Sequence, residues 1–131
     1  METLKDPIVI LWLCILLHLI ADYPLQGILC DLKQISWWNI QISKAAIPDT
    51  DRYEWDWLAG LSCHALMWSI ISCLPLFMIG TTQGVSVCIV INAVIHGIID
   101  HLKANMYVIN LWQDQILHFV QVIITVGILA Y

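Results

Sequence analysis

Apolar and polar positions follow one another along this chain in long blocks, with four apolar segments separated by polar stretches. The apolar segments cover residues 7–25, 58–79, 85–103 and 111–131. An α-helix rises about 1.5 Å per residue, so each segment is close to the roughly 20 residues that cross a hydrocarbon core of about 30 Å. We therefore predict an all-α fold, an integral membrane bundle of four transmembrane helices that forms a single domain over residues 1–131.

The stretch between the first two apolar segments, residues 26–57, differs in character. Charged side chains alternate there with four tryptophans, Trp37, Trp38, Trp55 and Trp57. Indole rings concentrate at the headgroup level of a bilayer because the ring is largely apolar and one edge is polar. We predict that this Trp-rich interfacial segment lies along the membrane surface as part helix and part loop, with a break at Pro48.

The composition also indicates a membrane protein. Hydrophobic residues make up 60% of the chain and charged residues 11%, whereas soluble domains carry about 25% charged residues. The net charge of -5 argues against nucleic acid as a partner. The five cysteines form no CxxC pair, and we interpret them as small core residues. The expected partner is therefore the lipid bilayer.

The basic residues predict an orientation. With four spans, the loops after the first and third spans share one side of the membrane. These loops contain Lys33, Lys44, Arg52 and Lys103, and the other side contains Lys5. Because basic loops remain in the cytoplasm, we predict that both termini lie outside. A bacterial inner membrane is the expected location.

Histidine and aspartate occur four residues apart within the apolar segments. The pairs are His18 with Asp22, His96 with Asp100, and Asp114 with His118, and His64 stands alone in the second segment. Residues at i and i+4 share a helix face, so each pair directs an imidazole and a carboxylate to one place. In an up-and-down bundle all these positions fall at one membrane face, within about two helical turns of the surface. We therefore predict one shared polar cluster.

Such a cluster favours a divalent metal. A charged aspartate at the centre of a spanning helix costs about 2.5–3.5 kcal/mol, and a divalent cation offsets several carboxylates at once. The predicted metal ligands are His18, Asp22, His64, His96, Asp100, Asp114 and His118. Imidazole nitrogen and carboxylate oxygen suit zinc, which we favour, and also manganese or iron. The set exceeds the needs of one tetrahedral ion, so either two ions bind or some carboxylates act from outside the metal shell.

The predicted activity is metal-dependent hydrolysis of a lipid-linked or membrane-embedded substrate near the cytoplasmic face. Asp22, Asp100 and Asp114 would complete the metal shell or accept a proton from metal-bound water. Lys103 and Gln26 could contact a phosphate. The Trp-rich interfacial segment could act as a lid or as a lipid-facing platform.

Several of these residues also have a structural interpretation. His64 could be a hydrogen-bonded core residue, and Asp22 a helix-end turn residue. Asp114 could be a charge near a helix N-terminus that the helix dipole stabilises. Lys103 could neutralise Asp100. His101 lies about 100° around the helix from Asp100, so we expect it outside the site.

Two other classes of function use the same cluster. A non-catalytic phage or bacterial membrane factor, holin-like or partner-inhibiting, would need the cluster only to fix helix packing. A transporter of protons or divalent ions would need a polar path to the opposite face. The outer halves of the spans offer few polar groups for such a path, namely Ser69, Ser72, Ser86, Asn92 and Thr125. This shortage decides against transport.

The order of the motifs HLIADYPLQ, LSCHAL, HGIIDHLK and DQILH resembles the DUF3307 family of small bacterial and phage integral membrane proteins. The resemblance runs over most of the chain. It implies roles for His18, Asp22, Gln26, His64, His96, Asp100, Lys103, Asp114, Gln115 and His118. More distantly, the motifs are similar to those of membrane-bound metal-dependent hydrolases, which carry His and Asp pairs on several helices.

Overall fold

The computed structural model describes residues 5–47 and 50–130, and every regular element in them is helical. The α-helices are α1 (Pro7–Asp22), α2 (Leu29–Leu32), α3 (Ile35–Lys44), α4 (Asp56–Cys73), α5 (Thr82–Ala104) and α6 (Leu111–Ala130), and 3-10 helices cover Asp51–Tyr53 and Leu74–Met78. The predicted all-α class is therefore confirmed. The predicted break at Pro48 lies outside the described residues.

Three helical stretches are long and apolar enough to cross a membrane, namely Asp51–Met78, α5 and α6. They correspond to the last three predicted apolar segments. Helix α5 begins at Thr82 rather than at residue 85 because Thr81 caps it, its Oγ1 accepting a hydrogen bond from the Gly84 N–H at 3.1 Å. These helices indicate a membrane protein.

The first apolar segment forms a shorter helix than predicted. Helix α1 has 16 residues and ends at Asp22 rather than at residue 25. Pro24 explains the end, because proline has no N–H to donate to the Ile20 carbonyl oxygen, which instead accepts from the Leu25 N–H at 3.1 Å. At about 1.5 Å per residue α1 rises about 24 Å, less than the roughly 30 Å of a hydrocarbon core.

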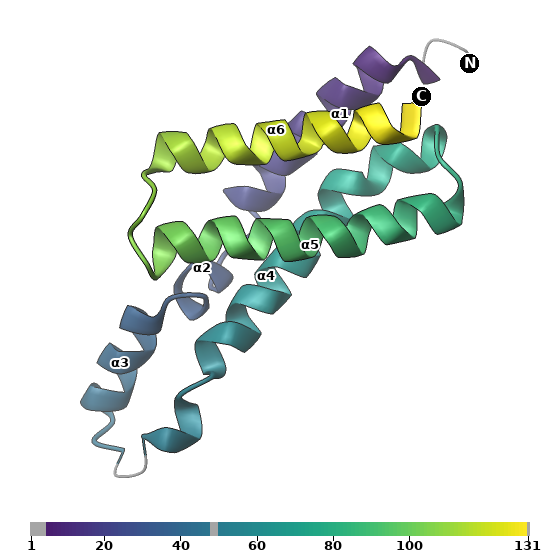
Figure 1. Ribbon diagram of the computed structural model, residues 1–131. Coiled ribbons are helices and arrows are strands. Elements are labelled where there is room, and N and C mark those ends of the chain that lie inside the picture. Colours follow the sequence, from purple (N-terminus) through teal and green to yellow (C-terminus); the bar gives the residue numbers. More distant parts are fainter. Residues whose placement is uncertain (1–4, 48–49, 131) are drawn as a thin grey trace.

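The four longest α-helices form a closed ring. Helix α1 packs against α4 and α6, and α5 packs against the same two helices. Figure 1 shows α5 and α6 running side by side in opposite directions, with α4 crossing obliquely behind α5. Helix α3 lies next to the first turns of α4, away from the α5–α6 hairpin. The space between the four helices is where inward side chains meet.

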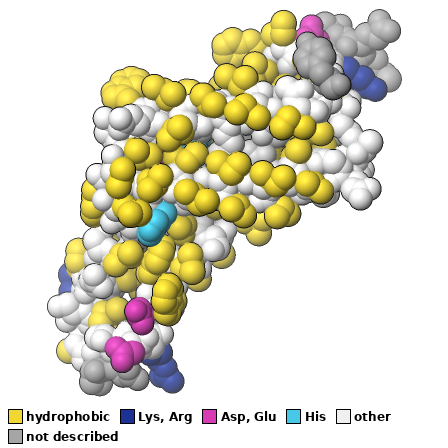
Figure 2. All heavy atoms as spheres, in the orientation of Figure 1, with side chains coloured by type: hydrophobic (Ala, Val, Ile, Leu, Met, Phe, Trp, Pro, Cys, Tyr) yellow, Lys and Arg dark blue, Asp and Glu magenta, His cyan; other side chains and the backbone are white. Residues whose placement is uncertain are grey.

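The side chains are distributed opposite to those of a soluble protein. Large apolar residues on the outer faces of α5 and α6 are exposed, among them Val90 at 62% and Ile128 at 68%, and Figure 2 shows hydrophobic side chains covering this surface. The interior holds histidine, aspartate, asparagine and glutamine beside an apolar core that includes Ile10, Trp68 and Leu76. Apolar surface outside and paired polar groups inside are what a lipid environment favours.

Helix α2 is held tightly against the bundle, and this places the residue that follows it. Gly60 of α4 has no side chain where α2 crosses, since a Cβ there would lie 2.6 Å from the Leu32 carbonyl carbon. Asn105, at the end of α5, donates to the Lys33 carbonyl oxygen at 3.0 Å and accepts from the Ile35 N–H at 2.8 Å. The Lys33 side chain is thereby directed inward, where it is 8% exposed.

Candidate metal centre

The seven predicted ligand residues meet at one place inside the ring. Helix α1 contributes His18 and Asp22, α4 contributes His64, α5 contributes His96 and Asp100, and α6 contributes Asp114 and His118. None of these residues is more than 6% exposed. The spacing of four residues within each pair explains the convergence, because both members of a pair lie on the inward face of their helix.

One subset of these residues has the dimensions of a tetrahedral metal site. Ligand atoms of Asp22, His64, His96 and Asp100 lie within 4.8 Å of one another. His64 Nε2 is 3.2 Å from His96 Nε2, 3.1 Å from Asp100 Oδ2 and 3.5 Å from Asp22 Oδ1, and His96 Nε2 is 3.6 Å from Asp100 Oδ2. Ligand atoms of a tetrahedral site with bonds of about 2.0–2.1 Å are about 3.3–3.4 Å apart. These four distances bracket that value. We name these residues the first ligand group.

A second subset shares the residue Asp22 with the first. Ligand atoms of Asp22, Asp114 and His118 also lie within 4.8 Å of one another, and we name them the second ligand group. His118 Nε2 is 3.4 Å from Asp114 Oδ1. Both atoms are buried and lack a hydrogen-bond partner among the described residues. Buried polar atoms rarely lack a hydrogen-bond partner. The two unpartnered atoms are therefore consistent with an additional group that binds between them.

His18 belongs to neither ligand group because both of its ring nitrogens are engaged. The Trp68 indole donates to His18 Nδ1 at 2.8 Å, and an indole N–H can only donate. The His18 proton therefore sits on Nε2, where it is donated to Gln115 Oε1 at 3.2 Å. No nitrogen lone pair of His18 remains for a metal. His18 is thus in neither group of residues that could hold a metal, and its ligand role stays a prediction.

The same chain of hydrogen bonds continues to two carboxylates. Because Gln115 accepts through Oε1, its amide nitrogen faces the aspartates and donates to Asp22 Oδ2 at 2.9 Å and to Asp114 Oδ2 at 3.1 Å. Trp68 and His18 therefore fix the amide of Gln115, and Gln115 orients one carboxylate of each ligand group. Groups that orient metal ligands in this way commonly matter for metal affinity. Trp68 has no sequence signal of its own, since it is one apolar residue in an apolar helix.

A contact between His96 and His118 couples the two ligand groups. Their Nδ1 atoms lie 3.2 Å apart, so one ring donates its proton and the other accepts it. If His96 Nε2 binds a metal, His96 Nδ1 donates, and a neutral His118 carries its own proton on Nε2. If His118 Nε2 binds a metal, the same reasoning places a proton on His96 Nε2. With both rings neutral and this hydrogen bond intact, His96 and His118 could not both bind a metal through Nε2, so the arrangement favours one ion over two.

Two lysines lie against the cluster. Lys33 Nζ is 2.6 Å from Asp100 Oδ2, and Lys103 Nζ is 2.9 Å from Asp114 Oδ2. Lys33 belongs to the Trp-rich interfacial segment. No local sequence pattern distinguishes it from Lys44, the other lysine of that segment. Its role depends on the close packing of α2 against α4, which only the tertiary structure shows.

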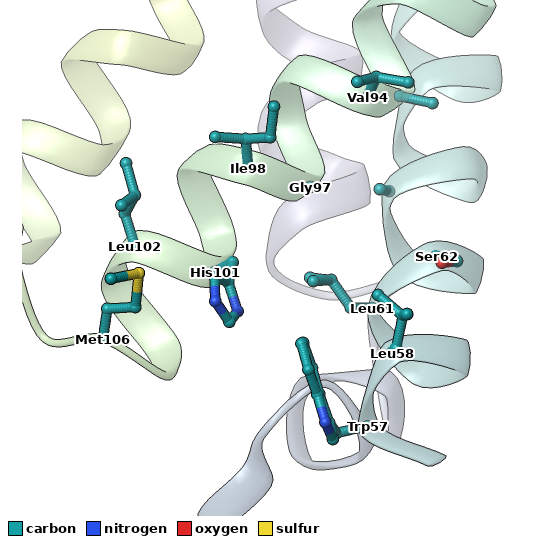
Figure 3. A pocket seen from close by; sticks show the side chains of 12 residues that line it. Trp57, Leu58, Leu61, Ser62, Val94, Gly97, Ile98, His101, Leu102 and Met106 are labelled. Carbon is teal, nitrogen blue, oxygen red and sulfur yellow. The ribbon is translucent and has the colours of Figure 1, made fainter. Parts of the chain in front are cut away.

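His101 lies outside the cluster. Its ring stacks on Trp57 with centroids 5.0 Å apart and planes inclined by 20°. Figure 3 shows this pair at one end of a cavity between α4 and α5 that is lined mainly by apolar side chains and has a volume of about 550 Å³. His101 therefore serves as a matched control for the four histidines of the cluster.

A separate polar layer lies further along α5 and α6. Gln121 Nε2 donates to Asn92 Oδ1 and to the Asn92 carbonyl oxygen, both at 2.8 Å, and Asn92 Nδ2 donates to Thr125 Oγ1 at 3.0 Å. The three side chains are at most 7% exposed. These hydrogen bonds join α5 to α6 within the interior, while Gln121 Oε1 is buried without a partner among the described residues.

Comparisons of the chain with models of known protein families, with curated proteins and with solved structures find no match. The likeness to the DUF3307 family therefore stays an expectation that rests on the motifs. The chemistry of the centre follows from its own residues.

Proposed function

We propose that this protein is an integral membrane metalloprotein that binds one divalent ion and hydrolyses a lipid-linked or membrane-embedded substrate. The observation that carries the proposal is the first ligand group. Its four ligand residues are buried, and four of its six ligand-atom spacings, 3.1–3.6 Å, are close to those of a tetrahedral site. Zinc suits two nitrogen and two oxygen donors in this arrangement. Manganese and iron accept the same donors.

In this proposal the ligands are Asp22, His64, His96 and Asp100. The ion would polarise the scissile phosphoryl or carbonyl group and make a bound water more acidic. A metal-bound histidine usually donates the N–H of its other ring nitrogen to an acceptor. His96 would do so, because its Nδ1 proton is donated to His118. His64 differs, since its Nδ1 has no partner among the described residues.

Asp114 is the proposed general base. Its Oδ1 is buried without a hydrogen-bond partner among the described residues, while Lys103 and Gln115 hold its Oδ2. Hydrolysis forms a bond from the water oxygen to the phosphorus or carbonyl carbon and breaks the bond to the leaving group. Asp114 accepts one proton of that water and returns it to the leaving group.

We propose that α1 completes a bundle of four spans. Its outward side chains Ile8, Trp12 and Leu16 are 53–66% exposed, as expected of a helix that faces lipid. A helix shorter than the hydrocarbon core is accommodated by local thinning of the bilayer at modest cost. The proposed orientation, with both termini outside, now depends chiefly on Lys44 and Arg52, because Lys33 and Lys103 form ion pairs at the cluster.

The experiment is elemental analysis of protein purified in detergent and resupplied with zinc, manganese or iron. Wild type is expected to hold one equivalent of metal. His96→Gln and Asp22→Asn are expected to lose it, whereas His18→Gln is expected to retain the ion more weakly. The control His101→Gln changes the histidine outside the cluster and is expected to match wild type. Circular dichroism shows that each variant is folded.

The possible outcomes separate the parts of the proposal. Two equivalents in wild type would overturn the single ion and the sharing of a proton between His96 and His118. No metal in a folded wild type would overturn the metalloprotein itself. With one ion bound, hydrolysis of phosphate and carboxylic esters in mixed micelles is tested with wild type and Asp114→Asn, and activity that survives Asp114→Asn would exclude Asp114 as the base.

One observation favours a second candidate, a non-catalytic membrane factor whose cluster fixes helix packing. Lys33 and Lys103 already neutralise two of the three carboxylates without any ion. In that case folded wild type contains no metal, and His96→Gln lowers stability and biological effect together. Metal analysis therefore distinguishes the two candidates directly.

A further inference from the structure

A small cavity adjoins the metal centre at the end of α5. Its volume is about 220 Å³, and its lining includes Asp22, Gln26, Lys33, Lys103 and Tyr107. We call it the mouth pocket. Asp22, a member of the cluster, lines this pocket, and so do Lys33 and Lys103, which form ion pairs with the cluster. A group bound in the mouth pocket therefore lies next to the proposed ligands.

The charge of this region depends on the ion. Three carboxylates and two ammonium groups, those of Lys33 and Lys103, leave the cluster with one negative charge when its histidines are neutral. One divalent ion changes this to one positive charge. Opposite charges a few ångströms apart attract strongly in a site of low dielectric constant. The loaded centre therefore favours an anion at its opening, whereas the empty centre does not.

The lining of the mouth pocket suits a phosphate group. Lysine ammonium groups bind phosphate oxygens through charge-assisted hydrogen bonds. At the rim, Tyr107 is 73% exposed and has a left-handed φ of 57°, a conformation that bulky residues rarely adopt and that is often found at ligand sites. The pocket is smaller than the roughly 300–1,000 Å³ of sites that enclose a drug-sized ligand. It therefore fits a headgroup rather than a whole lipid.

We infer that the mouth pocket binds the phosphate group of the substrate, with the Lys33 and Lys103 ammonium groups as its cationic contacts. The inference depends on the proposed function, because the bound ion makes the charge of the centre positive. A peptide bond is neutral and gains nothing from two ammonium groups. The substrate class is therefore a phosphate ester, carried either by a lipid headgroup or by a soluble molecule.

The experiment is calorimetric titration of zinc-loaded protein in detergent micelles with three probes. These are inorganic phosphate, a short-chain phosphatidic acid and the matching neutral diacylglycerol. Wild type is expected to bind both phosphate probes and not the neutral one. Lys103→Gln is expected to bind them at least about tenfold more weakly, because it loses a charge-assisted hydrogen bond. Lys103→Arg is expected to retain most of the affinity.

Lys44→Gln is the matched control, since Lys44 is an exposed lysine of α3. Zinc content is measured in every sample. If phosphatidic acid binds more tightly than inorganic phosphate, the phosphate group of the substrate belongs to a lipid headgroup. If the two bind equally, it belongs to a soluble ester. A zinc-loaded wild type that binds neither phosphate probe, or Lys103→Gln that binds as tightly as Lys44→Gln, overturns the inference alone. A folded wild type without zinc overturns the proposed function as well.

Discussion

The Lys33 ammonium group lies 2.6 Å from Asp100 Oδ2, and the two side chains are 8% and 2% exposed. Asp100 Oδ2 also lies 3.1 Å from His64 Nε2, so one oxygen atom faces both the cation and the proposed metal position. A carboxylate oxygen has two lone pairs and can serve both. Lys33 therefore neutralises Asp100 in the bundle before any ion binds.

Replacing Lys33 tests how much the bundle depends on this pair. In metal-free protein, Lys33→Met is expected to lower the free energy of unfolding by about 3–5 kcal/mol, because it leaves a buried carboxylate without its partner. Lys33→Arg is expected to retain most of that stability. Denaturant titration in mixed micelles measures the change, with Lys44→Met as the exposed control. Equal stability of Lys33→Met and Lys44→Met would contradict a buried ion pair.

Gly60 is expected to be intolerant of any side chain. Its Cβ position lies 2.6 Å from the Leu32 carbonyl carbon, so Gly60→Ala must push α2 away and is expected to cost about 1–3 kcal/mol. The displacement also withdraws Lys33 from Asp100. The control is Gly127→Ala in α6, where a Cβ meets nothing within 4 Å and alanine favours the helix by up to about 1 kcal/mol. Thermal unfolding should therefore show opposite signs for the two variants.

Trp68→Phe tests the hydrogen-bond chain behind the centre. Without the indole N–H, His18 can change its protonated nitrogen and Gln115 can turn its amide, so Asp22 is oriented less firmly. Zinc affinity, measured by competition with a chelator, is expected to fall by about 10- to 100-fold although no ligand is lost.

The control for this variant is Trp12→Phe, which alters an indole of α1 that is 66% exposed. If Trp68→Phe lowers the melting temperature but leaves zinc affinity unchanged, Trp68 is a packing residue and the chain does not orient the ligands.

Gln121→Leu separates the polar layer from the metal centre. It removes two hydrogen bonds to Asn92 and is expected to lower stability by about 0.6–1.7 kcal/mol, between the average and the largest value for a hydrogen bond between membrane helices. Metal content is expected to stay at the wild-type value. Gln83→Leu, an exposed glutamine of α5, is the control. Loss of metal in folded Gln121→Leu would show that the two polar regions form one network.

The sequence by itself determined the helices and the approximate location of the centre. Hydrophobic segments of about 20 residues specify helices of membrane length, and a spacing of four residues specifies a shared face, because both depend only on local helix geometry. The pair His96 and Asp100 is inward-facing for that reason. The length of α1 was the local exception, where Pro24 ended the helix early.

Only the tertiary structure decided which atoms face one another. Lys33 reaches Asp100 because α2 crosses α4 at Gly60. His18 lies outside both ligand groups, and its Nδ1 accepts from the Trp68 indole of another helix. Such contacts join residues 50–67 positions apart. They depend on how far each helix is rotated and tilted against its neighbours, and no local pattern in the sequence encodes that rotation.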